Sequence, residues 1–247
     1  MSGFAIFGYH RLIAADTRGG RYELSSTEFA DHLQLLRQQG FKTLRLEEMS
    51  ARIRENRRDS GEKSVMLTFD DGYESDLLIA APLLLDHGFT AVFFVTTALV
   101  GTPGYMTPSQ LRRLSDSGME VQSHSHDHVF LPTLAVDDIK TQLQRSRDLL
   151  AEYGGREVDW ISVPGGRYSR QVIAAAREVG YRGIFTSAPG YGHGHSGGLL
   201  LLKRFIFENG TPLTTFSRIA HGRLPVMLRA GALYSLKRGL RRLLQRP

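Results

Sequence analysis

Short apolar stretches alternate along the chain with longer segments in which apolar residues recur every three or four positions. The apolar stretches predict strands near residues 4–9, 42–46, 64–69, 90–95, 119–123, 158–163, 182–187 and 199–206. The segments with helical spacing predict helices near residues 25–40, 74–87, 107–118, 136–153 and 169–179. Residues 190–198, which are rich in glycine and histidine, interrupt this order and are predicted to form a mobile loop. The alternation is typical of an α/β fold, a parallel sheet or barrel covered by helices.

Local capping signals mark the ends of two of these helices. Ser25, with Glu28 three residues later, forms a capping box, and Gly40 is placed to end the same helix. Thr107 and Gln110 form a second box at the start of another helix. Both helices are therefore predicted from residues that act locally.

Size and composition exclude several classes of protein. The chain has 247 residues, 41% of them hydrophobic, which suits one globular domain with its own core. No apolar run approaches the roughly 18–20 residues that cross a bilayer. Because there is no cysteine, disulfides and cysteine-ligated metals are excluded, and a metal would need histidine and carboxylate ligands. Residues 1–12 lack the features of a secretory signal, so we expect a cytoplasmic protein.

The net charge of +6 is concentrated at the carboxyl end. From Arg218 onward there are lysines and arginines but no acidic residue, and leucines recur at helical spacing at 233, 236, 240, 243 and 244. We predict that residues 211–247 form a basic amphipathic helical extension, which either contacts the anionic inner face of a membrane or packs its leucines on the body. Nucleic acid is not an expected partner, because no aromatic residue interleaves with the cations at 237–246.

Two carboxylates follow the buried strand pattern at 64–69. Asp70 and Asp71 precede Gly72, at the point where that strand is expected to end. Active sites of barrels and open α/β sheets are built at the carboxyl ends of the strands. Taken alone, the pair favours a plain turn in which one aspartate caps the next helix. A second cluster of polar residues makes a functional site the better interpretation.

That second cluster is a group of histidines after the strand predicted at 119–123. His124 and His128 can turn both imidazoles to one side if the backbone coils there, whereas His126 points elsewhere and is expected to be structural. Two imidazoles and a carboxylate from the other strand end make a metal site with open positions, as a hydrolytic metal requires. Zn²⁺ is the expected ion, and Co²⁺ or Ni²⁺ would also fit.

A third segment, Ser162 to Tyr168, follows the strand predicted at 158–163. The small residues after Pro164 let the backbone approach a ligand closely, and a free N–H there could donate to an oxyanion. As an isolated motif this segment is an ordinary turn.

The chain resembles the polysaccharide deacetylase family (NodB-homology, carbohydrate esterase family 4) in three motifs: Thr68 to Gly72, Ser123 to His128, and Pro164-Gly165. The early Gly8-Tyr9-His10 is similar to the start of many members. The resemblance covers about residues 4–206 and implies a distorted (β/α) barrel with a Zn²⁺-dependent N-deacetylase site. It implies roles for five residues: Asp70 as general base, Asp71, His124 and His128 as metal ligands, and the Gly165 N–H as oxyanion donor. The candidate substrate-binding residues are His10, Pro164, Gly166 and Tyr168.

Two positions depart from the family pattern. Ser162 stands where the family often has an arginine that orients the catalytic aspartate. Arg204 could supply the missing guanidinium, or it could be a solvated arginine at a strand end. The late Leu-x-His motif, whose histidine is the family's general acid, has no clear counterpart. This leaves the general acid unassigned, with candidates at His10, His193, His195 and His221.

We therefore expect a barrel at residues 1–210 and the basic extension at 211–247, in a cytoplasmic protein that could lie at the inner membrane face. The expected function is removal of an N-acetyl group from an amino sugar of a glycan or lipid-linked glycan, as in exopolysaccharide synthesis. Two alternatives are removal of a formyl group from a lipid-linked amino sugar and a non-catalytic barrel that binds a glycan or a partner. Phosphoryl transfer is disfavoured, because no glycine-rich phosphate loop accompanies the aspartates.

Overall fold

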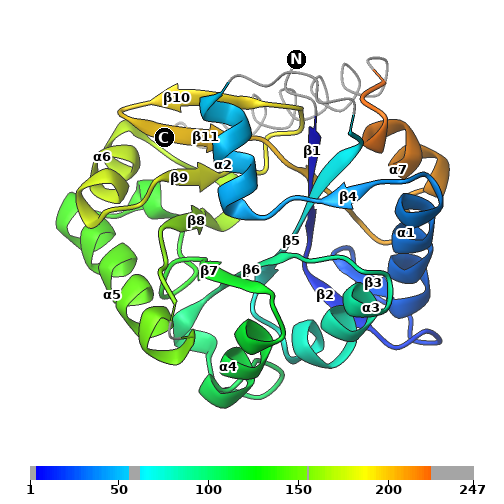
Figure 1. Ribbon diagram of the computed structural model, residues 1–247. Helices are drawn as coiled ribbons and strands as arrows, with labels where there is room; N and C mark the ends of the chain where they lie inside the picture. Colours follow the sequence, from blue (N-terminus) through cyan, green and yellow to red (C-terminus); the bar gives the residue numbers. More distant parts are fainter. Residues whose placement is uncertain (1–3, 56–61, 155, 224–247) are drawn as a thin grey trace, which may run out of the picture.

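A sheet of mostly parallel strands curves into a barrel at the centre of the molecule (Figure 1). The computed structural model describes residues 4–55, 62–154 and 156–223. The strand order is β10-β11-β9-β8-β7-β6-β5-β1-β12, with β4 paired to the start of β5, and β2 and β3 form a separate two-stranded sheet. The strands are β1 (Phe4–Tyr9), β2 (Arg11–Ile13), β3 (Glu23–Ser25), β4 (Lys42–Thr43), β5 (Ser64–Asp71), β6 (Val92–Val95), β7 (Glu120–Ser123), β8 (Trp160–Ser162), β9 (Gly183–Phe185), β10 (His193–Ser196), β11 (Leu199–Leu202) and β12 (Phe205–Ile206).

Most of the helices lie around the outside of this sheet (Figure 1). They are α1 (Ser26–Gln38), α2 (Leu46–Arg54), α3 (Ala81–Asp86), α4 (Pro108–Asp116), α5 (Val136–Gly154), α6 (Arg170–Val179) and α7 (Leu213–Ala220). A π-helical turn, Asp76–Ala80, leads into α3, and short 3₁₀ turns occur at Thr97–Leu99, Leu131–Thr133 and Pro164–Gly166.

One stretch of chain closes the barrel. β11 pairs with β9, whereas β12, only two residues later, pairs with β1 on the other side of the sheet. Lys203 and Arg204 lie between these two pairings, so Arg204 occupies the seam of the barrel.

Side chains alternate between the interior of the barrel and the surrounding helices, as strand geometry requires. Along β5, the odd-numbered residues from Val65 to Phe69 pack with the helices, whereas Met66 belongs to the cluster inside the barrel. Thr68 and Asp70 continue this inward row. The apolar interior therefore gives way to polar side chains at the carboxyl end of the strand.

Helix α2 covers the opposite end of the barrel. Its Leu46 and Met49 belong to the same interior cluster as Phe4 and Met66, which lie near the starts of their strands. The site at the carboxyl ends is thus supported from below by a closed apolar layer.

The predicted α/β barrel with outer helices is confirmed, and each strand and helix predicted between residues 4 and 206 has a counterpart. Both capping boxes form: the Ser25 side chain accepts from Glu28 N–H, and the Thr107 side chain accepts from Gln110 N–H. The sequence pattern does not predict α2, because its nine residues are too few for a clear period and its N-cap residue makes no side-chain cap.

The prediction of a mobile loop at residues 190–198 is wrong. Residues His193–Ser196 form β10, which pairs antiparallel with β11 at the edge of the sheet. An edge strand is held by backbone hydrogen bonds to one neighbour, so it does not need the apolar side chains by which strands are recognised in a sequence.

Part of the predicted carboxyl-terminal extension is described. Helix α7 places Phe216 against Phe7 and Phe207, with ring centroids 4.9 and 5.1 Å apart. The leucines predicted to form the amphipathic face at 233–244 lie outside the described residues. In the part of the chain that the structure describes, no helix is both long and apolar enough to cross a membrane.

Candidate active site

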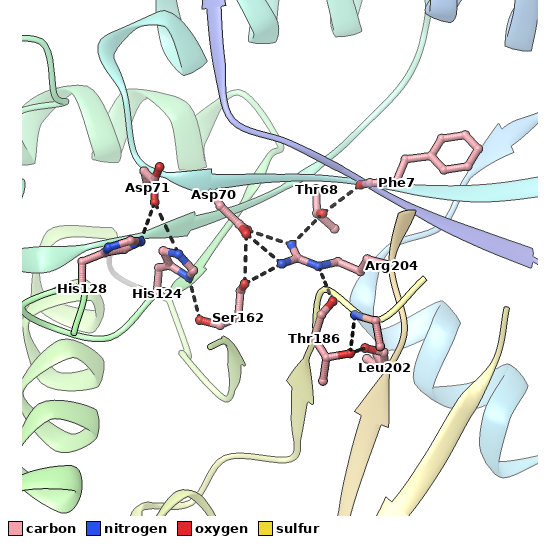
Figure 2. Close-up of polar contacts among 11 residues, drawn as sticks. Phe7, Thr68, Asp70, Asp71, His124, His128, Ser162, Thr186, Leu202 and Arg204 are labelled. Carbon is pink, nitrogen blue, oxygen red and sulfur yellow. Dashed lines mark hydrogen bonds and ion pairs between the residues drawn. The ribbon is translucent and has the colours of Figure 1, made fainter. Parts of the chain in front are cut away.

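The predicted chemical residues meet at the carboxyl ends of the strands (Figure 2). Asp70 and Asp71 end β5, His124 follows β7 directly, and Arg204 lies at the seam after β11. Because parallel strands end at the same edge, positions far apart in the sequence lie side by side there.

Asp71, His124 and His128 form a group that could hold a metal ion. Asp71 Oδ1 lies 3.4 Å from His124 Nε2 and 3.2 Å from His128 Nε2. Ligand atoms about 2.0–2.1 Å from a tetrahedral Zn²⁺ are roughly 3.3 Å apart, so these separations fit a shared ion. No other group of three or more such ligands occurs among the described residues.

A backbone contact orients His124 for this role. Its Nδ1 lies 2.6 Å from the carbonyl oxygen of Ser162, which can only accept, so Nδ1 carries the proton. In the neutral ring, Nε2 then presents a lone pair to the Asp71 carboxylate. Two acceptors that face each other require a cation or a proton between them, and a metal ion satisfies this need.

The charges around the triad favour a bound cation. Burial would raise the pKa of Asp71, but its interactions with the neighbouring imidazoles of His124 and His128 outweigh burial and lower it. Burial would lower the pKa of His124, but the carboxylates of Asp70 and Asp71 outweigh burial and raise it. The site is therefore electronegative enough to hold positive charge, and it is open to solvent at His128, whose side chain is exposed.

Three residues of the site adopt a strained backbone. Asp71, Ser125 and His128 have φ angles of +85°, +68° and +57°, and no other non-glycine residue among those described has a positive φ. The left-handed region is unfavourable for residues with a Cβ atom, and such residues concentrate at functional sites. Coiling of the backbone after β7 is what turns His128 back towards Asp71.

His126 takes no part in the triad, as predicted. Its Nδ1 lies 2.7 Å from Thr97 Oγ1, on the segment that follows β6. The N–H groups of Thr97 and Ala98 donate to the carbonyls of Ser125 and His126. These contacts fix the loop that carries His124 and His128.

Arg204 binds Asp70 with both ends of its guanidinium. Nη1 lies 2.8 Å from Oδ1 and Nη2 lies 2.7 Å from Oδ2, and the arginine side chain is fully buried. Arg204 also donates to Thr68, Ser162 and Thr186. Of the two alternatives for Arg204, the solvated strand-end arginine is wrong, and the guanidinium occupies the place beside the aspartate.

This contact keeps Asp70 ionised. Burial would raise the pKa of Asp70, but the positive charge of Arg204 is the main influence that outweighs burial and lowers the pKa to about 2. Ser162 Oγ, 3.2 Å from Oδ2, adds a further hydrogen bond. Asp70 is thus an oriented carboxylate next to the triad but outside it.

The turn predicted at the third motif exposes one residue. Gly165 is exposed, with φ +62°, while its neighbours Pro164 and Gly166 are buried. The hydrogen bonds that close the turn are donated by the Gly166 and Arg167 N–H groups to the carbonyls of Val163 and Pro164.

The structure does not favour Gly166 or Tyr168 as groups that contact a substrate. A Cβ on Gly166 would lie 2.5 Å from the backbone nitrogen of Ser187, so this glycine serves close packing of two segments. Tyr168 is half-buried and packs on the outer core.

His10 is the best placed of the remaining histidines. It follows β1, is half-buried against Tyr22 with ring centroids 4.9 Å apart, and its Nδ1 has no hydrogen-bond partner among the described residues. Burial lowers its pKa, against the charges of Asp70 and Asp71. The late candidates lie elsewhere: His193 and His195 contact each other on β10, and His221 contacts Phe41.

A barrel with three side chains that could hold a metal ion beside an ionised aspartate is the arrangement expected for metal-assisted hydrolysis. Comparison with known proteins is consistent with this class. The polysaccharide deacetylase family matches residues 57–184, more than half of the chain, and the chain belongs to this family.

Curated relatives share part of the sequence. The chain is 29% identical to the polysaccharide deacetylase homologue YxkH of Bacillus subtilis over 185 residues, which are 75% of this chain and 64% of that protein. It is 31% identical to the peptidoglycan-N-acetylmuramic acid deacetylase PdaA of Bacillus subtilis over 131 residues, 51% of this chain and 47% of that protein. The chain thus spans between about half and two-thirds of the length of these relatives.

Solved structures share the fold over most of the chain. The deacetylase PplD of Streptococcus pyogenes superposes with a TM-score of 0.78 at 23% identity, covering 91% of this chain and 97% of that one. IcaB of Ammonifex degensii gives 0.75 at 24% identity, covering 89% and 96%.

Proposed function

We propose that this protein is a metal-dependent deacetylase that removes the N-acetyl group from an amino sugar of a glycan or lipid-linked glycan. The observation that carries the proposal is the Asp71-His124-His128 triad next to a carboxylate that Arg204 holds ionised. Family membership and the names of the relatives support a carbohydrate substrate.

Asp71, His124 and His128 would hold the metal ion. Two imidazoles and one carboxylate favour Zn²⁺, and they would also accept Co²⁺ or Ni²⁺. When bound, such an ion polarises a carbonyl oxygen and lowers the pKa of water.

Asp70 is the proposed general base. Its carboxylate lies beside the triad and is fixed by Arg204, so it can accept the proton of the attacking water without taking up a metal-ligand position. The Gly165 N–H is the proposed donor to the oxyanion that forms as the water adds to the acetamide carbon. Of the histidines outside the triad, His10 is the candidate to protonate the leaving amine, since it follows β1 at the carboxyl ends of the strands and its Nδ1 has no hydrogen-bond partner among the described residues.

The two alternatives make different predictions. A formyl group would be removed by the same arrangement, so formate would be released in place of acetate. A non-catalytic barrel would not need Asp70. The contact of Arg204 with Asp70 favours a catalytic barrel. It supplies the guanidinium that the family often places at the position of Ser162, and the lack of that arginine was the reason to consider a non-catalytic barrel.

The division into a barrel at 1–210 and a basic extension at 211–247 is also part of the proposal. The leucines and arginines of the extension would place the site next to an anionic membrane surface that carries a lipid-linked substrate.

Acetate and formate release test this function. The zinc-supplied protein is incubated with N-acetylated and N-formylated chitooligosaccharides, beside Asp70→Asn and the control Asp86→Asn, which changes an exposed aspartate at the end of α3. We expect acetate release by the native protein and the control, and a loss of at least about 100-fold in Asp70→Asn, in line with removal of a general base. Equal release by native protein and Asp70→Asn would refute the proposed role.

A further inference from the structure

An exposed aromatic ring beside the candidate site lies under an arginine that has no acidic partner among the described residues. Phe130, two residues after His128, is 41% exposed. The guanidinium carbon of Arg167, two residues after Gly165, lies 3.9 Å from the centre of the Phe130 ring. The Phe130–Arg167 pair therefore joins the loop that carries a metal ligand to the turn at the third motif.

The pair lies on the rim of the site. A Cβ built on Gly165 would meet Phe130 Cε1 at 2.6 Å, so the ring lies directly against the exposed glycine. Since Gly165 is the proposed oxyanion donor, a sugar whose acetamide reaches Gly165 would have its neighbouring groups near this ring and guanidinium.

Among the described residues, every other arginine that lies over an aromatic ring has an acidic partner; these are Arg11, Arg21, Arg182 and Arg204. Arg11, over Tyr73, is 3.1 Å from Glu23. Arg21, over the ring of Tyr22, is 2.5 Å from Glu208.

Arg167 differs from these four arginines. Among the described residues its side chain makes no ion pair and no hydrogen bond, and its contact is the stack on Phe130. Stacking occupies the flat face of the guanidinium and leaves the N–H groups at its edge, which match the geometry of a carboxylate or a phosphate.

We propose that Phe130 and Arg167 form a subsite for an acidic group on the sugar substrate. The ring supports the guanidinium and offers a surface for a sugar ring, and the arginine binds a carboxylate or phosphate near the reacting acetamide. The subsite rests on the proposed function and narrows its substrate class to N-acetylated sugars that carry negative charge.

Kinetics with matched neutral and acidic substrates test the subsite. The substrates are tri-N-acetylchitotriose, an oligosaccharide of N-acetylmuramic acid for the carboxylate, and N-acetylglucosamine 1-phosphate for the phosphate. The variants are Arg167→Gln and Arg167→Lys, with Arg170→Gln as a control at an exposed arginine at the start of α6.

The native protein is expected to prefer one of the acidic substrates, and the preferred one identifies the acid. Arg167→Gln should raise KM for that substrate about 10- to 100-fold, as expected for a lost charge-assisted hydrogen bond, and leave the neutral substrate within twofold. Arg167→Lys should recover part of the loss, because it keeps the charge but not the planar fork. Arg170→Gln should change neither substrate.

An equal effect of Arg167→Gln on neutral and acidic substrates, or no preference in the native protein, would overturn the subsite while leaving the deacetylase function in place. If the native protein hydrolyses none of the substrates, the proposed function fails, and the subsite is then tested by calorimetric binding of N-acetylmuramic acid and N-acetylglucosamine 1-phosphate. Equal Kd values for native protein and Arg167→Gln would reject it.

Discussion

Replacing Arg204 with methionine should unfold the protein more readily by leaving a buried carboxylate unpaired. Arg204 is fully buried, and Asp70 is 3% exposed. Removal of one partner from a buried ion pair typically destabilises a protein by about 3–5 kcal/mol, because the remaining charge is not solvated. Thr186 O would lose a donor as well.

The contribution of the Arg204–Asp70 ion pair to stability depends on pH. In the native protein the pKa of Asp70 is lowered from 3.8 to about 2, and such a shift corresponds to roughly 2–3 kcal/mol. This stabilisation is fully present above pH 4 and is lost as the pH falls towards 2. Without Arg204, burial dominates and the pKa of Asp70 rises above its ordinary value. The variant should therefore become less stable as the pH rises from 4 to 7.

Urea unfolding of the metal-free protein measures this contribution. Arg204→Met, Asp70→Asn and the double variant are compared with the native chain at pH 4.5 and pH 7. We expect Arg204→Met to lose about 3–5 kcal/mol at pH 7 and less at pH 4.5, and the double variant to lose at least about 2 kcal/mol less than the sum of the single changes. Additive losses, or a loss in Arg204→Met below about 1 kcal/mol, would refute the reasoning.

Other changes test the packing around the site. Burial lowers the pKa of His32 to about 4, so the free energy of unfolding should fall by about 3 kcal/mol as the pH drops from 6.5 to 4. In urea unfolding, His32→Gln should abolish this pH dependence. An unchanged pH dependence in the variant would contradict the prediction. Asp76 is fully buried, its pKa is raised, and neither carboxylate oxygen has a partner among the described residues. Asp76→Asn should therefore raise the free energy of unfolding by about 1 kcal/mol or more at pH 8, and by less at pH 4. An equal loss of stability at the two pH values would argue against this reasoning. Gly166→Ala should destabilise by about 2–4 kcal/mol, since its Cβ meets Ser187, whereas Gly88→Ala, with a similar φ but open space, should cost about 1 kcal/mol. Equal thermal midpoints for the two alanine variants would show that the clash is relieved.

Much of the fold could be predicted because its signals are local. Ser25 and Thr107 cap their helices through residues three positions away, and buried strands are recognisable from a few consecutive apolar side chains. Helix α2 and strand β10 escaped prediction because tertiary contacts stabilise them: Met49 packs into the barrel interior, and β10 depends on the backbone of β11.

The site was predictable where one rule sufficed. Carboxyl ends of parallel strands share an edge, so Asp71 and His124 were expected to meet, and they do. The role of Arg204 could not be settled from the sequence, because its partner Asp70 is 134 residues away and the contact depends on closure of the barrel between β11 and β12. The subsite at Phe130 has no sequence signal either, since it depends on a stack between two separate loops.

The central claim is that Asp71, His124 and His128 bind the metal while Asp70 does not, and zinc stoichiometry tests it most directly. The protein is supplied with zinc, dialysed and measured by elemental analysis, beside Asp71→Asn, His124→Ala and Asp70→Asn. The account predicts one tightly held equivalent in the native protein and in Asp70→Asn, and loss of that zinc in the other two variants. A folded native protein that retains no zinc, or variants of Asp71 and His124 that retain it fully, would contradict the account.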